Sequence, residues 1–246
     1  MQRNKKQLEI VLMHYFRNCY SGFPKGKMIP FESPDFIISL RSRNILGVEL
    51  TRLNPLNALI PDESELRNRD LQEQIIALAQ SVFEQSFSRK LFVKFLFADH
   101  IKILKERKLT LALQVVQIIR KIVGVTGVGS FFSESVSSDL LPAALDGLLV
   151  IQDPVLDVSI WERSNNLGVS ENVVADIHEA IRKKDEKLQI YQKHRLNYYW
   201  LLITTDRLRG VKSYRLSEKI MNSSFQSRFQ QVFLFDLIKS TVYQLV

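Results

Sequence analysis

The hydrophobic and polar positions along the chain follow two different periods, which predict a mixture of strands and helices. Short runs rich in apolar and β-branched residues indicate strands, and we expect these at 36–40, 45–50, 90–98, 144–152, 156–162 and 198–205. Apolar residues at steps of three and four indicate amphipathic helices, and we expect these at 5–20, 62–82, 111–124 and 171–195. The glycine- and serine-rich segment 124–139 is typical of a loop, and 231–246 predicts one more strand, with a short helix after it left open.

The order of these elements predicts the fold class. A strand hairpin comes first, and strands that alternate with helices follow it. This order favours an α/β or α+β fold in which a mixed central β-sheet is flanked by helices.

The predicted helix at 171–195 carries a lysine within its apolar stripe. The stripe follows steps of three and four, through Val174, Ile177, Ile181, Lys184, Leu188 and Tyr191. Burying an unpaired ammonium group is costly, so we expect Lys184 to meet a carboxylate or to reach an open site. The alternative is a side chain that extends its charge to solvent at the rim of the core. Lys187 lies on the same edge of the stripe.

Two carboxylates flank the predicted hairpin ESPDFIISLRSRNILGVELT at 32–51. Asp35 directly precedes the first strand, and Glu49 lies near the end of the second. If the strands pair, the two carboxylates converge at one end of the sheet, where they repel each other unless a cation compensates. Mg²⁺ prefers such oxygen ligands. The alternative is that Asp35 caps a turn and Glu49 is a surface residue at a strand end.

Composition and charge add weaker indications about the partner and compartment. The chain has 34 Lys and Arg against 26 Asp and Glu, which gives a net charge of +8 and favours a polyanionic partner. The single Cys19 excludes an internal disulfide and a cysteine-cluster metal site. No apolar run reaches the length of a membrane span, and no signal peptide is recognisable, so we expect a cytoplasmic protein without a membrane partner.

The motifs at 32–51, together with the distant lysine helix and the strand YYWLLI, resemble the PD-(D/E)XK nuclease superfamily, which has the restriction-endonuclease-like fold. Pro34-Asp35 is similar to its PD element, and Glu49-Leu50-Thr51 is similar to its (D/E)XK element, with Thr51 where lysine is expected. Within the superfamily the chain resembles a group of largely uncharacterised bacterial members. The resemblance implies one nuclease-like domain over 1–246, with 60–150 as an insertion between the hairpin and the helix and strand at 171–205.

The resemblance also implies roles for individual residues. Asp35, Glu49 and the backbone carbonyl of Leu50 would ligate Mg²⁺, or Mn²⁺ in its place. The core helix would supply the lysine that is missing at Thr51, with Lys184 as the first candidate and Lys187 as the second. Some members carry an acid on the first helix, and Glu9 would be that residue, although an ordinary exposed glutamate is the alternative.

Basic residues outside the motifs are candidates for phosphate contacts. They lie in the hairpin turn and in a basic run further along the chain, at Arg41, Arg43, Lys102 and Lys105. A solvated charged face is the alternative for each of them.

Three functions follow as hypotheses. The first is a Mg²⁺-dependent nuclease that hydrolyses phosphodiester bonds in DNA. The second is a catalytically inactive nuclease-like module that binds nucleic acid or a protein. The third is a partner-binding protein in which the carboxylates and the lysine form a structural ion-pair cluster. A homodimer remains open in each case.

Overall fold

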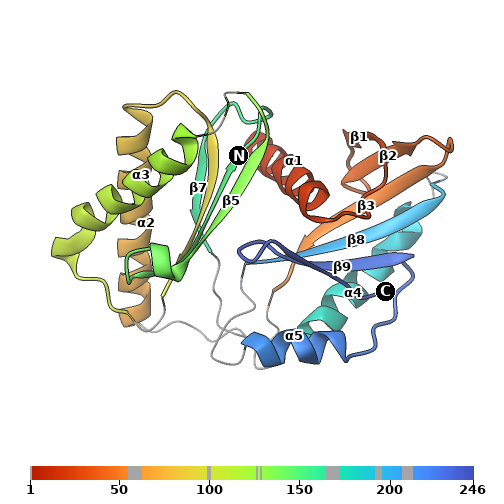
Figure 1. The fold of residues 1–246 in the computed structure, drawn as a ribbon. Helices are drawn as coiled ribbons and strands as arrows, with labels where there is room; N and C mark the ends of the chain where they lie inside the picture. The colour runs from red at the N-terminus through yellow and green to blue at the C-terminus, as the bar shows by residue number, and fades with distance from the viewer. Residues whose placement is uncertain are drawn as a thin grey trace. The chain divides into compact units, whose positions relative to one another are not determined.

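The computed structural model describes residues 2–54, 63–98, 101–125, 127, 129–164, 172–191, 196–206 and 213–246 (Figure 1). The chain divides into two compact units. The first unit comprises Met1–Tyr15 and Ile60–Asn165, and the second comprises Phe16–Leu59 and Asn166–Val246. Helix α1 (Gln2–Cys19) begins in the first unit and ends in the second. Among the described residues, no helix is both long enough and apolar enough to cross a membrane.

The first unit is a four-stranded sheet packed against two helices. The strand order is β5-β6-β4-β7, with bounds β4 (Leu91–Phe97), β5 (Phe132–Ser137), β6 (Leu145–Gln152) and β7 (Ile160–Arg163). Helices α2 (Glu63–Glu84) and α3 (Lys108–Gly124) bury their apolar stripes against alternate residues of β4, among them Val93 and Phe95. Two short 3₁₀ helices, Lys105–Arg107 and Ser138–Leu140, complete this unit.

The second unit is a six-stranded mixed sheet in the order β1-β2-β3-β8-β9-β10. Its strands are β1 (Gly26–Pro30), β2 (Phe36–Leu40), β3 (Ile45–Arg52), β8 (Tyr198–Thr205), β9 (Gln231–Asp236) and β10 (Thr241–Gln244). Strands β1, β2 and β3 pair antiparallel, β3, β8 and β9 pair parallel, and β10 returns antiparallel to β9. The central strands β8 and β9 are apolar on both faces, as strands covered on both sides require.

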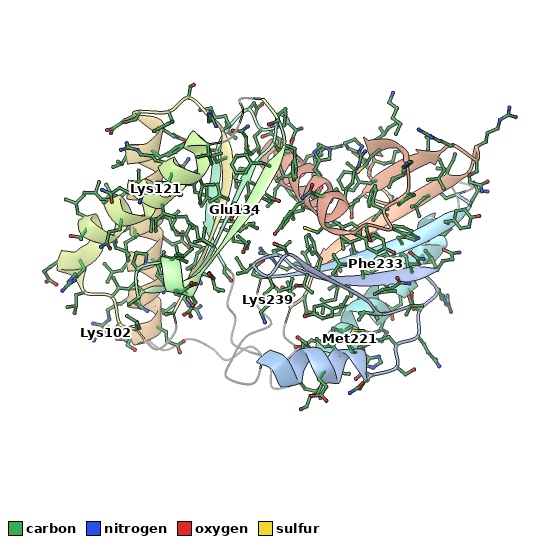
Figure 2. All side chains as sticks on the ribbon, in the orientation of Figure 1. Lys102, Lys121, Glu134, Met221, Phe233 and Lys239 are labelled. Carbon is green, nitrogen blue, oxygen red and sulfur yellow. The ribbon has the colours of Figure 1, made fainter. Side chains whose placement is uncertain are left out.

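Each face of this second sheet packs against a different helix. Helix α4 (Val173–Tyr191) places Ile177 and Ile181 in a buried cluster with Leu201 of β8, and helix α5 (Ser213–Met221) contributes to the same cluster. On the other face, the end of α1 places the Phe16 ring 5.3 Å from the ring of Phe233, which Figure 2 labels on β9. Residues that alternate along one strand therefore divide between an α4 face and an α1 face.

The mixed α/β fold predicted from the sequence is confirmed, and several elements depart from the prediction. The predicted loop at 124–139 contains β5, whose sequence FSESVS is polar and is held through its ladder with β6. A second strand, β10, follows β9 where a short helix was left open. Strand β7 covers only the end of the predicted strand at 156–162, and β1 and α5 were not predicted. The segment 60–150, expected as an insertion, falls within the range of the first unit.

Three predicted helix boundaries lie outside the described residues. The predicted starts at Asp62 and Glu171 and the predicted end at Arg195 belong to segments that the structure does not describe. Within the described residues, α2 begins at Glu63 and α4 ends at Tyr191.

Candidate functional site

The pairing of β2 with β3 brings the two predicted carboxylates to one end of the hairpin. Phe36 is registered opposite Val48, so Asp35 and Glu49 follow as the next residues on the two strands. The Leu50 backbone N–H donates a hydrogen bond to Asp35 Oδ2 at 2.7 Å. Asp35 is thus held against β3, beside Glu49, by a bond from the backbone of the next residue.

Glu49 faces α4 because of the register between β3 and β8. Glu49 is paired with Leu201, which belongs to the cluster beneath α4, and residues directly opposite in a sheet share a face. The Glu49 side chain is only 7% exposed. A buried carboxylate needs a partner of opposite charge or several hydrogen bonds, and α4 supplies a cation.

Lys184 provides that cation from the apolar stripe of α4. Its Nζ donates to Glu49 Oε1 at 2.6 Å, across 135 positions of the sequence, and its side chain is 17% exposed. The prediction that Lys184 meets a carboxylate is confirmed. Lys187, the second candidate, is exposed one turn further along the helix. The carboxylates of Asp35 and Glu49 and the ammonium of Lys184 therefore gather where β3 passes beneath α4.

The ladder between β2 and β3 ends just before Leu50. Leu40 N donates to Asn44 O at 2.9 Å, and hydrogen-bonded pairs in an antiparallel ladder recur at every second residue. The register ends at Phe36 and Val48, and the Pro34 ring lies over Gly47, with Cγ 2.6 Å from the position of an added Cβ atom, so that Pro34 does not stand opposite Leu50. Leu50 lies beyond the last paired residues of β2 and β3, and its N–H donates to the Asp35 side chain.

The oxygen atoms of Asp35, Glu49 and Leu50 are suitable ligands for a hard divalent cation. Two carboxylates and a backbone carbonyl are the oxygen ligands that Mg²⁺ takes, with water completing its shell. Among the described residues, no group of three or more His, Cys, Asp or Glu side chains is placed to hold a metal ion. A metal here would use Asp35, Glu49 and the Leu50 carbonyl, the three groups that the resemblance implies.

The Lys184 side chain lines a cleft of about 540 Å³. Thr51, Arg52, Lys183 and Lys187 also contribute to its wall. Thr51 brings no charge to it, and Thr204 Oγ1 donates to the Thr51 carbonyl at 3.3 Å. The only cations reaching this cleft from β3 and α4 among the described residues are thus Arg52 and the three lysines.

Acidic residues of α4 partly balance these cations. Glu179 lies 3.3 Å from Lys183 Nζ, and a hydrogen bond from the Arg182 guanidinium lowers the pKa of Glu179 to about 2. Arg52 pairs with Asp206 at 3.2 Å, at the carboxyl ends of the neighbouring strands β3 and β8. Asp206 directly follows the strand YYWLLITT, a position that the sequence reasoning did not use.

The remaining predicted residues belong to the hairpin turn or to the first unit. Arg41 and Arg43 are exposed in the turn between β2 and β3, and Arg43 is roughly 20 Å from Glu49 at about 3.3 Å per strand residue. Glu9, which lies 3.6 Å from Lys5, belongs to the first unit. Two further exposed lysines of that unit are Lys102, labelled in Figure 2, and Lys105. The described site in the second unit contains none of these residues.

Comparison with known proteins leaves the site to be interpreted from its own geometry. No family model, no curated protein and no solved structure matches the chain. What can be interpreted is a buried lysine–glutamate pair and an aspartate held beside it by a backbone N–H.

Proposed function

We propose that the second unit is a Mg²⁺-dependent nuclease site that hydrolyses phosphodiester bonds in DNA. The observation that carries this proposal is the 2.6 Å contact between Lys184 and Glu49, beside the carboxylate of Asp35. Phosphodiester hydrolysis needs a cation to neutralise charge on the phosphate and a way to position water, and this group of residues suits both tasks. Mn²⁺ would serve in place of Mg²⁺.

Each residue has a defined task in this proposal. Asp35, Glu49 and the Leu50 carbonyl would hold the metal, which when bound supplies Lewis acidity toward a phosphate oxygen. Lys184 has three N–H donors and gives one of them to Glu49, so the others can stabilise the negative charge that develops on the phosphate. The bond from Leu50 N–H fixes the orientation of Asp35 before any substrate arrives.

Lys184 can also compensate for the absence of a lysine at position 51. A threonine hydroxyl cannot replace an ammonium electrostatically, but Thr51 and Lys184 line the same cleft. A lysine that reaches the carboxylates from α4 can take over the task that the resemblance assigns to position 51. Lys187 then serves as a phosphate contact at the rim, where it is exposed.

A second candidate is an inactive module that binds nucleic acid or a protein. The same contact favours it, because Lys184 Nζ sits on Glu49 itself, as in a structural ion pair. In that case the cations of the cleft would bind a ligand without cleaving it. The cytoplasm stays the proposed compartment in either case, and a homodimer stays open.

Cleavage assays distinguish the two candidates. Purified protein is incubated with supercoiled plasmid and with single-stranded DNA in Mg²⁺, Mn²⁺ or EDTA. The nuclease proposal predicts metal-dependent nicking that Asp35→Asn abolishes, while Lys219→Ala, at an exposed lysine of α5 that does not line the cleft, retains it. DNA binding by a wild-type protein that shows no nicking would favour the inactive module. Nicking that survives Asp35→Asn would refute the site.

A further inference from the structure

The face of the second sheet that carries Glu49 is exposed at the edge strand β1 (Figure 1). The strand pairings place four residues in one row across this sheet, namely Ile29, Ile37, Gly47 and Tyr199. Tyr199 belongs to the buried cluster beneath α4, and Glu49 follows Gly47 by two residues, so the row and Glu49 share the α4 face. At the β1 end of the row, Ile29 is 42% exposed, so this part of the α4 face is open.

Phe31 continues this exposed strand to the candidate site. It directly follows β1, its N–H donates to the Asp35 carbonyl oxygen at 2.7 Å, and its side chain is 37% exposed. In the described part of the chain, Phe31 and Tyr198 are the only exposed aromatic residues. An exposed ring is therefore attached to the backbone directly beside the aspartate that the proposed function assigns to the metal.

The segment that leads to this ring is basic. Residues 25–31 have the sequence KGKMIPF, in which Lys25 and Lys27 are exposed and no residue is acidic. Lys27 precedes Ile29 by two residues on β1 and therefore shares its face. A cation, an apolar side chain and an aromatic ring thus follow one another along the strand toward Asp35. We call Lys27, Ile29 and Phe31 the β1 strip.

The chemistry of the β1 strip suits an unpaired nucleotide strand. Proteins bind single strands by combining cations along the backbone with aromatic rings on which the bases stack, whereas a duplex hides the faces of its bases within the stack. A protein strand added to β1 would need backbone donors along the edge, and Pro30 within β1 has none. The observations therefore favour a single-stranded nucleic acid over a duplex or a protein strand.

We infer that the β1 strip binds a single-stranded segment of the DNA substrate, with a base stacked on Phe31 and a phosphate beside Lys27. The choice of DNA as the ligand rests on the proposed function. Because the backbone of Phe31 is bonded to that of Asp35, the bound strand is presented to the carboxylates, and the enzyme prefers single-stranded or locally unpaired DNA to a continuous duplex.

Binding of the full chain to DNA in EDTA tests the stacking role without cleavage. Fluorescence anisotropy compares a labelled single strand of about 12 nucleotides, its blunt duplex, and an abasic strand of the same length that has phosphates but no bases. Phe31→Leu should bind the single strand at least fivefold more weakly, and this loss should vanish on the abasic strand and on the duplex. Phe31→Trp keeps a ring and should bind the single strand at least as tightly as the wild type.

Tyr198→Leu is the matched control for Phe31→Leu. Tyr198 is 42% exposed at the start of β8, where its hydroxyl accepts a hydrogen bond from Asn44 at 3.4 Å. It precedes Tyr199, so it lies on the opposite face of the sheet from the β1 strip. Tyr198→Leu should bind the single strand within twofold of wild type, and a loss equal to that of Phe31→Leu would overturn the inference.

The salt dependence of the same binding tests Lys27. Lys27→Ala should reduce the slope of log affinity against log salt for the single strand by about 0.7–1, because one phosphate contact is lost. Lys219→Ala, at an exposed lysine of α5, should leave the slope unchanged. A slope in Lys27→Ala that equals the wild-type slope would overturn the phosphate contact.

Several results would overturn the stacking role. They are a wild-type protein that binds no single-stranded DNA, a loss below twofold in Phe31→Leu, and an equal loss on the abasic strand. A wild-type dimer that becomes monomeric in Phe31→Leu, with DNA binding unchanged, would overturn it in favour of self-association through β1. If Phe31→Leu does not fold, the indole introduced in Phe31→Trp decides, because its fluorescence should be quenched by the single strand and not by the abasic strand.

Binding and cleavage together separate failure of this inference from failure of the proposed function. Binding of the single strand that depends on Phe31, in a protein that never nicks DNA, would refute the nuclease and support the β1 strip. Metal-dependent nicking by a protein whose single-strand affinity is the same in the wild type and in Phe31→Leu would support the nuclease and overturn the β1 strip.

Discussion

Removing the ammonium of Lys184 should destabilise the second unit, because it leaves the Glu49 carboxylate buried without a counter-charge. Breaking a buried ion pair by deleting one partner costs about 3–5 kcal/mol. The Glu49 side chain is 7% exposed and that of Lys184 is 17% exposed, so we expect the lower end of this range, about 3 kcal/mol, for Lys184→Ala. Replacing both partners, in Lys184→Met/Glu49→Gln, should cost much less, since no charge is left buried.

The two tryptophans allow the assay to report on each unit separately. Trp161 lies in β7 of the first unit and Trp200 lies in β8 of the second, so urea unfolding in a Trp161→Phe background follows the second unit by fluorescence. Lys183→Ala is the matched control on the same helix. Its side chain is 61% exposed, and its pairing with Glu179 should be worth less than about 1 kcal/mol. A coupling energy below about 0.5 kcal/mol between Lys184 and Glu49 in a double-mutant cycle would refute the reasoning.

Three further predictions concern Asp35 as hydrogen-bond acceptor, the exposed Lys187, and the stability of the protein at acid pH. Asp35→Asn keeps an acceptor for the Leu50 N–H, so its free energy of unfolding in urea should lie within about 0.5 kcal/mol of the wild-type value. Asp35→Ala removes the acceptor and should lower the free energy of unfolding by about 1.5–3 kcal/mol. Equal losses in the two variants would contradict the hydrogen bond. Lys187→Ala should weaken DNA binding and reduce the slope of log affinity against log salt by about 1, and an unchanged slope would exclude a phosphate contact. The depressed pKa of Glu179, about 2 against an ordinary 4.5, adds stability that is fully present above pH 4.5 and is lost as the pH falls toward about 2. Glu179→Gln should remove that small acid dependence in low salt, and unfolding curves that match wild type at every pH in this range would contradict it.

Periodicity predicted the helix that carries the site. A lysine at a step of three within an apolar stripe must either meet an opposite charge or leave the core, and Lys184 meets Glu49. Strands β2 and β8 could be predicted for a related reason, because their short β-branched and aromatic runs are bounded by turn residues. Local patterns of this kind are visible in the sequence because a buried face needs apolar residues at the period of its helix or strand.

Other parts of the structure leave no such local pattern. Strand β5 is polar along most of its length, and its ladder with β6 depends on backbone groups that every residue shares. The packing of Pro34 over Gly47 depends on residues that become neighbours only when β2 pairs with β3. Arg41 and Arg43, predicted as candidates for phosphate contacts, are exposed, but sequence alone did not show that their turn lies at the far end of the hairpin from Asp35.

The central claim is that Lys184 supplies the charge that Thr51 lacks, and a transplanted lysine tests it most directly. Nicking of supercoiled plasmid in Mg²⁺ is measured for the wild type, Lys184→Ala and Lys184→Ala/Thr51→Lys. Because both positions line one cleft, we predict that Lys184→Ala slows nicking by about 10²–10³-fold and that a lysine at position 51 recovers at least tenfold of this loss. Nicking by Lys184→Ala at the wild-type rate, or a folded double variant with no recovery, would contradict the account.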